Sequence, residues 1–206
     1  MIAGLGLRAF RGGAVAVVVS VEASVPRVLL STTLATSADG DRLSREPYQV
    51  ASEMACDPDG KASAEAAAAV AEGRRRQDAL ATRNLQDIVG RLKAAGYDTA
   101  IAALLVNRAG WVTNLLDYSL AWPDHVPVAE GLAVRDALRA ALGASGIETI
   151  EYDEKILHDL AHHTLNMWST EIDAHLKAMG TTAGKPWRKE QKLACLAAWM
   201  AMGALR

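Results

Sequence analysis

Two histidines four residues apart are the first residues whose spacing suggests chemistry. His158 and His162 share one face of a helix, because residues at i and i+4 lie one above the other. Zinc hydrolases with an HExxH helix use two histidines in this arrangement and a glutamate as the general base. Asp159 takes the place of that glutamate and is one methylene shorter. The motif predicts His158 and His162 as metal ligands and Asp159 as a catalytic base.

A catalytic zinc also requires a third protein ligand. Glu171, Asp173 and His175 are the nearest candidates along the chain, and none lies at a diagnostic spacing. Histidines on the polar face or at the end of an amphipathic helix are the ordinary alternative. Both interpretations stay open on the sequence alone: a zinc-dependent hydrolase, or a helix with solvated histidines.

Other catalytic and nucleotide-binding motifs are missing from the sequence. It contains no GxGxxG, no P-loop and no GxSxG, and Gly4 and Gly6 do not fit the first of these patterns. The chain therefore lacks the phosphate-binding loop of dinucleotide-binding and P-loop proteins and the nucleophile motif of α/β-hydrolases.

Charge and composition limit the partners. The 206 residues carry 22 Lys and Arg against 24 Asp and Glu, so no overall field attracts a phosphate backbone or an anionic membrane. Nucleic-acid binding would need a local basic patch, and the compact basic run at residues 74–76 is typical of a solvated helix face. No stretch of about 18 apolar residues occurs, so no membrane span is expected. The isolated Cys56 and Cys195 favour a reducing cytoplasm.

Five segments have the composition of strands. Residues 14–21 and 99–106 are nearly continuous apolar runs, which are typical of buried strands. Residues 27–34 follow the first run after a short polar connection, which predicts an antiparallel hairpin. Residues 147–152 form a short strand, and residues 48–54 are expected to supply another. We expect the runs at 14–21 and 99–106 to be neighbours in one sheet.

Helix formers dominate four further segments. They fill residues 64–95 almost without a break, and Gly96 follows as a C-cap. Residues 128–144 repeat apolar side chains at helical spacing. Residues 157–177 and 189–205 are expected to form two terminal helices.

The order of these elements resembles that of the ribonuclease H-like fold. Antiparallel strands come first, then alternating helices and strands, and each later strand must join through a right-handed crossover. Residues 128–157, VAEGLAVRDALRAALGASGIETIEYDEKIL, resemble a helix, a short strand and the following segment of bacterial Holliday-junction resolvases. The resemblance implies a single α/β domain over residues 1–206. This domain would have three layers, with a mixed sheet that begins with an antiparallel hairpin and with helices on both faces.

Enzymes of that family resemble one another most in four carboxylates that hold two divalent metal ions for phosphodiester hydrolysis. The resemblance places an aspartate on the first strand, where this chain offers Glu22, and a glutamate at the end of a later strand, where it offers Asn107. In the terminal helix, an aspartate pair gives way to Arg188, Lys189, Glu190, Gln191 and Lys192. We expect Glu22, Asn107 and Glu190 to lie near one another at the edge of the sheet.

A chain with this scaffold and without these acids is expected to bind or regulate rather than to cleave. We therefore predict a non-catalytic ribonuclease H-like protein without a cofactor, whose ligand is a nucleic acid or a partner protein. The alternative is a metal-dependent hydrolase or nuclease that uses zinc on His158 and His162, or magnesium with Glu22 and Glu190. The remaining candidate ligands are four scattered acids, and such residues are more often solvated: Asp39, Asp153, Glu154 and Asp159.

The last predicted helix is apolar nearly all round. Residues 193–205 read LACLAAWMAMGAL, and a helix without a polar face must be buried on several sides. Trp199 and Met200 are the kind of large anchors that interfaces use. We expect a homodimer or a protein partner to cover this helix, the alternative being a helix packed wholly against its own sheet.

Overall fold

The computed structural model describes residues 1–54, 56, 61–107, 112 and 114–205. Five strands form one sheet in the order β3-β2-β1-β4-β5. The first three are antiparallel neighbours, and β4 and β5 run parallel to β1. The α/β class and the mixed sheet with an antiparallel start are therefore confirmed. The strands are β1 (Ile2–Phe10), β2 (Gly13–Glu22), β3 (Val25–Ala35), β4 (Asp98–Val106) and β5 (Glu148–Asp153).

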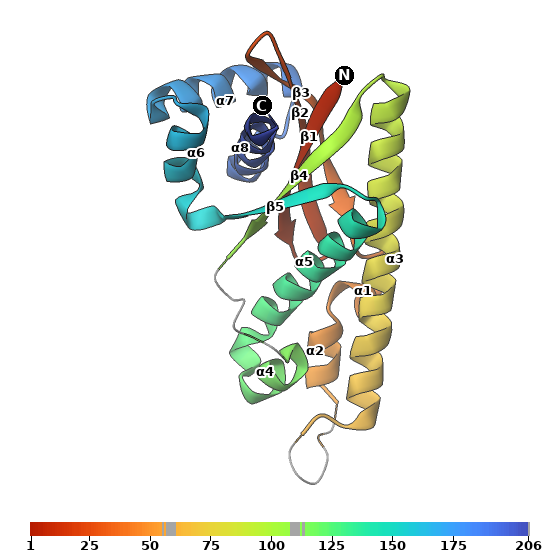
Figure 1. Ribbon diagram of the computed structural model, residues 1–206. Coiled ribbons are helices and arrows are strands. Elements are labelled where there is room, and N and C mark those ends of the chain that lie inside the picture. Colours follow the sequence, from red (N-terminus) through yellow and green to blue (C-terminus); the bar gives the residue numbers. More distant parts are fainter. Residues whose placement is uncertain (55, 57–60, 108–111, 113, 206) are drawn as a thin grey trace.

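Helices cover both faces of the sheet (Figure 1). One face carries α8 (Lys189–Ala204), with α6 (Leu157–Leu165) and α7 (Ser169–Ala183) beside it, and the other carries α3 (Ala64–Ala94) and α5 (Val126–Ala144). Three short helices pack near the first half of α3, and two 3-10 turns complete the chain: α1 (Arg42–Arg45), α2 (Pro47–Ser52), α4 (Leu115–Ala121), η1 (Pro123–His125) and η2 (Glu154–Ile156). None of the described helices is both long enough and apolar enough to cross a membrane.

The strand β2 supplies both halves of the core. Val15, Val17 and Val19 face α8, while Ala16 and Val18 face α3 and α5, because successive side chains of a strand point to opposite faces. An apolar run without alternation, as in β2, is thus what a strand covered on both faces requires.

The sequence did not reveal β1, and the expected neighbours are wrong for that reason. β1 lies between β2 and β4, so residues 14–21 and 99–106 share a sheet without touching. Gly4 and Gly6 make β1 a poor strand by composition. They are required because α8 approaches closely: a Cβ on Gly6 would lie 1.8 Å from the carbonyl oxygen of Ala194.

The helix α8 is covered by its own chain. Residues 193–202 are all buried, and the helix packs on β1, β2 and β4 beneath α6 and α7. Complete intramolecular cover is therefore achieved, and α8 offers no exposed apolar face on which a homodimer could form. Sequence reasoning underestimated the cover because residues 157–183 fold over α8.

Residues 48–54 are helical where a strand was expected. Most of them belong to α2, and its first N–H groups are satisfied by a distant carboxylate. Oε1 of Glu130 on α5 accepts hydrogen bonds from the backbone N–H of Tyr48 and of Gln49, both at 2.9 Å. Burial raises the pKa of Glu130 to about 7, although these two hydrogen bonds act in the opposite direction. A tertiary partner 82 residues from Tyr48 therefore decides the local structure.

The predicted helix over residues 157–177 is two helices. The first ends at Asn166, whose φ of 51° is left-handed and acts as a C-cap. The second begins at Ser169. The break turns α7 away from α6, so that both contribute to the cover of α8 (Figure 1).

Candidate functional site

Three parallel strands end at the same edge of the sheet. Arg8 of β1 is in register with Leu105 of β4, and Val106 is in register with Asp153 of β5. Polar residues therefore follow the strands side by side: Arg8, then Asn107 after β4, then Asp153 and Glu154. In open α/β sheets, ligands bind outside the carboxyl ends of the strands.

The start of α8 adds two lysines to this edge. Because Gly4 and Gly6 let α8 lie close on β1, its first turns reach the end of that strand. Lys189 and Lys192 are three residues apart, hence on one helix face, and both line a cavity of about 700 Å³ together with Arg8 and Asn107. We call this space the strand-end cavity; its other lining residues are Ala9, Arg135, Glu154, Lys155, His158, Asp173, Leu176 and Leu193.

The strand-end cavity is strongly cationic. Five Arg and Lys side chains line it against two carboxylates, although the whole chain has a net charge of −2. One cation is neutralised, since Arg8 donates to both oxygens of Glu154 at 2.9 and 3.0 Å. Within the described part of the chain, the side chains of Arg135, Lys155, Lys189 and Lys192 have no carboxylate within 4.0 Å.

Arg135 of α5 is the most constrained of these cations. Its Nε is buried and has no hydrogen-bond partner among the described residues. Burial lowers the pKa of Arg135, nearby Glu154 opposes that shift, and Arg139 and Arg8 reinforce it. Arg135 is only partly buried, but a buried Nε without a hydrogen-bond partner has a free-energy cost, and an anion at this position would reduce that cost.

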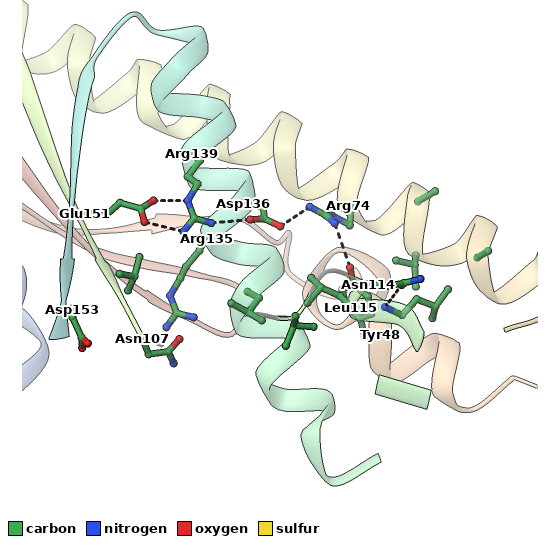
Figure 2. A pocket seen from close by; sticks show the side chains of 17 residues that line it. Tyr48, Arg74, Asn107, Asn114, Leu115, Arg135, Asp136, Arg139, Glu151 and Asp153 are labelled. Atoms are coloured by element: carbon green, nitrogen blue, oxygen red, sulfur yellow. Dashed lines mark hydrogen bonds and ion pairs between the residues drawn. The ribbon is translucent and has the colours of Figure 1, made fainter. Parts of the chain in front are cut away.

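A second cavity of about 870 Å³ lies beyond Arg135 (Figure 2). We call it the helical cavity, because α2, α3, α4 and α5 supply most of its lining. It shares Asn107 and Arg135 with the strand-end cavity. In Figure 2 the side chain of Arg135 extends from α5 toward Asn107, away from Arg139 and Asp136.

Those ion pairs form a chain along one wall of the helical cavity. Arg74 bonds Asp136 at 2.9 Å, Arg139 bonds the other oxygen of Asp136 at 2.8 Å, and Arg139 also reaches Glu151 at 3.2 Å. Arg75 and Arg76 pair with Glu72. The basic run at residues 74–76 is therefore neutralised by neighbouring acids.

Two solved structures share this arrangement of strands and helices. One is described as the Thermus thermophilus RuvC structure, and it aligns with a TM-score of 0.54 at 12% identity over 99% of this chain and 95% of that chain. The other is T. thermophilus RuvC in complex with Holliday junction substrate, with a TM-score of 0.55 at 12% identity over 100% of this chain and 96% of that chain. The fold is ribonuclease H-like. No protein-family model and no curated protein sequence matches the chain.

This ribonuclease H-like structure separates residues that the sequence placed together. Glu22 ends β2, which runs antiparallel to β1, so it lies at the opposite end of the sheet from Asn107. There it contacts Arg27 at 3.4 Å and the hydroxyl of Tyr97 at 3.5 Å. Glu190 lies on α8 but does not line the strand-end cavity. The expected cluster of Glu22, Asn107 and Glu190 is thus wrong.

The error has one cause, the missing first strand. β1 is the first strand of the fold, and Arg8 lies near its carboxyl end, whereas Glu22 ends the second strand. Asn107 does lie at the end of the later strand, and α8 contributes Lys189, Lys192 and Leu193 to the cavity lining. A pair of divalent cations requires carboxylate oxygens, so these residues do not fit the metal centre of the nuclease family.

The histidine motif is also dispersed. His158 and Asp159 are exposed on α6, and the Nδ1 of His162 is 2.7 Å from the carbonyl oxygen of Met167. Of the suggested third ligands, Glu171 accepts a hydrogen bond from the backbone N–H of Trp168, and His175 packs edge-on against Trp199. Among the described residues, no group of three or more His, Cys, Asp or Glu side chains is placed to hold a metal ion.

Sequence reasoning missed Arg8 and Arg135 as functional candidates. Arg8 is at the end of an alternating segment, LGLR, in which Leu5 and Leu7 face the core and Arg8 points to the α8 side. That alternation was the available signal. Arg135 carried no signal, because a single arginine on an amphipathic helix is usually solvated.

Proposed function

We propose that this chain is a non-catalytic ribonuclease H-like protein that binds nucleic acid through its phosphate backbone at the strand-end cavity. The observation that carries the proposal is the inversion of charge at this edge. Where the resemblance calls for metal-binding carboxylates, the chain has Arg8, Asn107, Lys189 and Lys192. A site that would repel divalent cations attracts phosphate directly.

The shared fold supports a nucleic-acid ligand. One of the similar solved structures is T. thermophilus RuvC in complex with Holliday junction substrate, and the alignment covers 96% of that chain. We infer that the edge of the sheet at the strand-end cavity faces nucleic acid in this protein.

The charge distribution predicts how the binding behaves. The overall charge of −2 gives no long-range attraction, so the affinity comes from the few cations of the cavity. Each phosphate neutralised by Lys or Arg releases counter-ions and adds roughly −0.9 to the slope of log K against log salt concentration. Binding should therefore be moderate in strength and steeply dependent on salt.

Fluorescence anisotropy with labelled duplex and four-way-junction DNA tests the proposal. The double variant Lys189→Gln/Lys192→Gln should weaken binding and reduce the salt slope by roughly 2 in magnitude. The matched control is Lys93→Gln/Lys177→Gln, which removes two exposed lysines from α3 and α7 that do not line the cavity. Equal affinity of the double variant, the control and the unmodified protein would overturn the proposal.

A second arm tests for catalysis. The same DNA incubated with Mg²⁺ or Mn²⁺ should remain intact, because the described residues at this edge include no set of carboxylates for two metal ions. Cleavage that disappears in Glu22→Gln or in His162→Ala would instead support the metal-dependent alternatives.

A further inference from the structure

The helical cavity has a different chemical character from the strand-end cavity that it adjoins. Three arginines and three carboxylates line it, so its charges balance, whereas the strand-end cavity has an excess of cations. The paired Arg74, Asp136, Arg139 and Glu151 present hydrogen-bonding groups without net charge along one wall. A ligand that spans both spaces would need an anionic head and an uncharged polar body.

Much of the remaining lining of the helical cavity is apolar. Val70 of α3, Leu115 and Leu116 of α4, and Leu132 of α5 contribute aliphatic surface. The amide of Asn114 is also at the rim of this cavity, beside Leu115 (Figure 2). Aliphatic surface together with a few convergent polar groups is the usual lining of a small-molecule site, and 870 Å³ lies within the usual size range.

Arg135 and Asn107 join the two spaces. Both residues line both cavities, and the buried Nε of Arg135 lacks a hydrogen-bond partner in the described structure. A phosphate at this junction would contact Arg135 directly while remaining within the field of Lys189 and Lys192. The group attached to that phosphate would then extend into the helical cavity.

We infer that the helical cavity takes the base of a single unpaired nucleotide whose phosphate is held by Arg135 at the junction with the strand-end cavity. The inference rests on the proposed function, because the phosphate lies at the same cationic edge. A nucleobase is planar and uncharged and has hydrogen-bonding edges, which matches the aliphatic and neutralised polar lining. A base in a duplex is stacked and paired, so it must be unpaired before it enters such a cavity.

Binding of two fluorescent probes tests the inference. One probe is a fully paired duplex. In the other, one strand lacks a single nucleotide, so that the nucleotide facing the gap is unpaired. The protein should bind the second probe about tenfold more tightly, since contacts to a single base have effects of this size.

Two variants on α3 separate the helical cavity from the cationic edge. Ala71→Trp fills the cavity from an exposed position that lines it, and Ala79→Trp places the same side chain at an exposed position of α3 outside the lining. Ala71→Trp should abolish the preference for the unpaired probe and leave duplex affinity unchanged, while Ala79→Trp keeps the preference. Equal affinity of the unmodified protein for both probes, or a preference that survives Ala71→Trp, would overturn the inference.

The lysine variant makes failure of the two proposals distinguishable. Lys189→Gln/Lys192→Gln should weaken both probes equally and keep their ratio. If it weakens neither, the proposed function fails; if it weakens both but no preference exists, only this inference fails. Titration with a nucleoside 5′-monophosphate, the nucleoside and inorganic phosphate adds the last distinction. Tight binding of the monophosphate alone would identify a free nucleotide as the ligand, and weak binding would favour a nucleotide within a strand.

Discussion

Arg8 and Glu154 lie 146 positions apart in the sequence and form a two-pronged ion pair, with nitrogen–oxygen distances of 2.9 and 3.0 Å. The pair links the end of β1 to the turn after β5, across the end of β4. Both side chains are about one quarter exposed. It therefore limits the charge of the strand-end cavity without being isolated from solvent.

Removal of this acid should strengthen nucleic-acid binding. Glu154→Gln frees the charge of Arg8, and an exposed charge interaction of this kind is worth up to about 1 kcal/mol, so DNA affinity should rise roughly threefold at low salt. Anisotropy at two salt concentrations measures the change, and the gain should shrink at the higher one. Glu148→Gln, at the exposed start of β5, is the control and should change little. A fall in affinity would mean that Glu154 contributes to binding rather than opposing it.

Arg135 should oppose stability and favour binding. Arg135→Met keeps the aliphatic stem but removes a partly buried charge whose Nε has no hydrogen-bond partner in the described structure. Relief of such a site commonly adds about 0.5–2 kcal/mol to the free energy of unfolding, which urea denaturation measures. DNA affinity should fall in the same variant. A variant that is less stable and binds normally would show that Arg135 has a structural role only.

Glu130 should make stability depend on pH. Its pKa is raised from 4.5 to about 7 in the folded protein, so between these values the folded state binds more protons than the unfolded state. Stability should therefore be highest below pH 4.5 as far as Glu130 is concerned, and should fall by up to about 3 kcal/mol as the pH rises to 7. Glu130→Gln is neutral at every pH and can still accept from the N–H groups of Tyr48 and Gln49.

Urea denaturation of the two proteins across this pH range measures the effect. The decline should be absent in Glu130→Gln and present in the control Glu148→Gln, which alters an exposed glutamate. Parallel pH profiles for all three proteins would contradict the assignment to Glu130.

The close contact of α8 with β1 should make Gly6 irreplaceable. In Gly6→Ala the new Cβ would lie 1.8 Å from the carbonyl oxygen of Ala194, which is backbone and cannot rotate away. Overpacking of this severity should cost about 3 kcal/mol or more in the free energy of unfolding. The control is Gly90→Ala in α3. Its new Cβ would lie more than 4 Å from any side chain or neighbouring element, and the change should stabilise the helix by roughly 0.5–1 kcal/mol. Thermal denaturation compares the two, and equal stability of both variants would show that α8 can shift away from β1.

The sequence predicts the strands that are defined by their own apolar composition, and it misses the elements that depend on tertiary contacts. The strands at residues 14–21, 27–34, 99–106 and 147–152 are apolar enough to identify themselves, and all four are confirmed within a few residues. The sequence does not identify β1 as a strand, because Gly4 and Gly6 are required for close packing against α8, a helix almost 190 residues away. Residues 48–54 were wrong for a related reason, since the carboxylate of Glu130 satisfies the start of α2.

The candidate site shows the same limit. Lys189 and Lys192 were noticed as cations in the terminal helix, but their proximity to Arg8 depends on how α8 lies against β1. The sequence points to Glu22 because β2, and not β1, has the composition of a first strand. Chemistry that comes from the ends of separate elements can be read from the sequence only after the order of the strands is known.

The packing of α8 also determines when this protein can fold on the ribosome. Residues 193–202 are synthesised long after the hairpin of β1 and β2, yet they cover one whole face of it. Until they leave the exit tunnel, Val15, Val17 and Val19 must remain exposed to water. A chain that lacks residues 189–204 would leave this face of the sheet uncovered, and we expect it to aggregate.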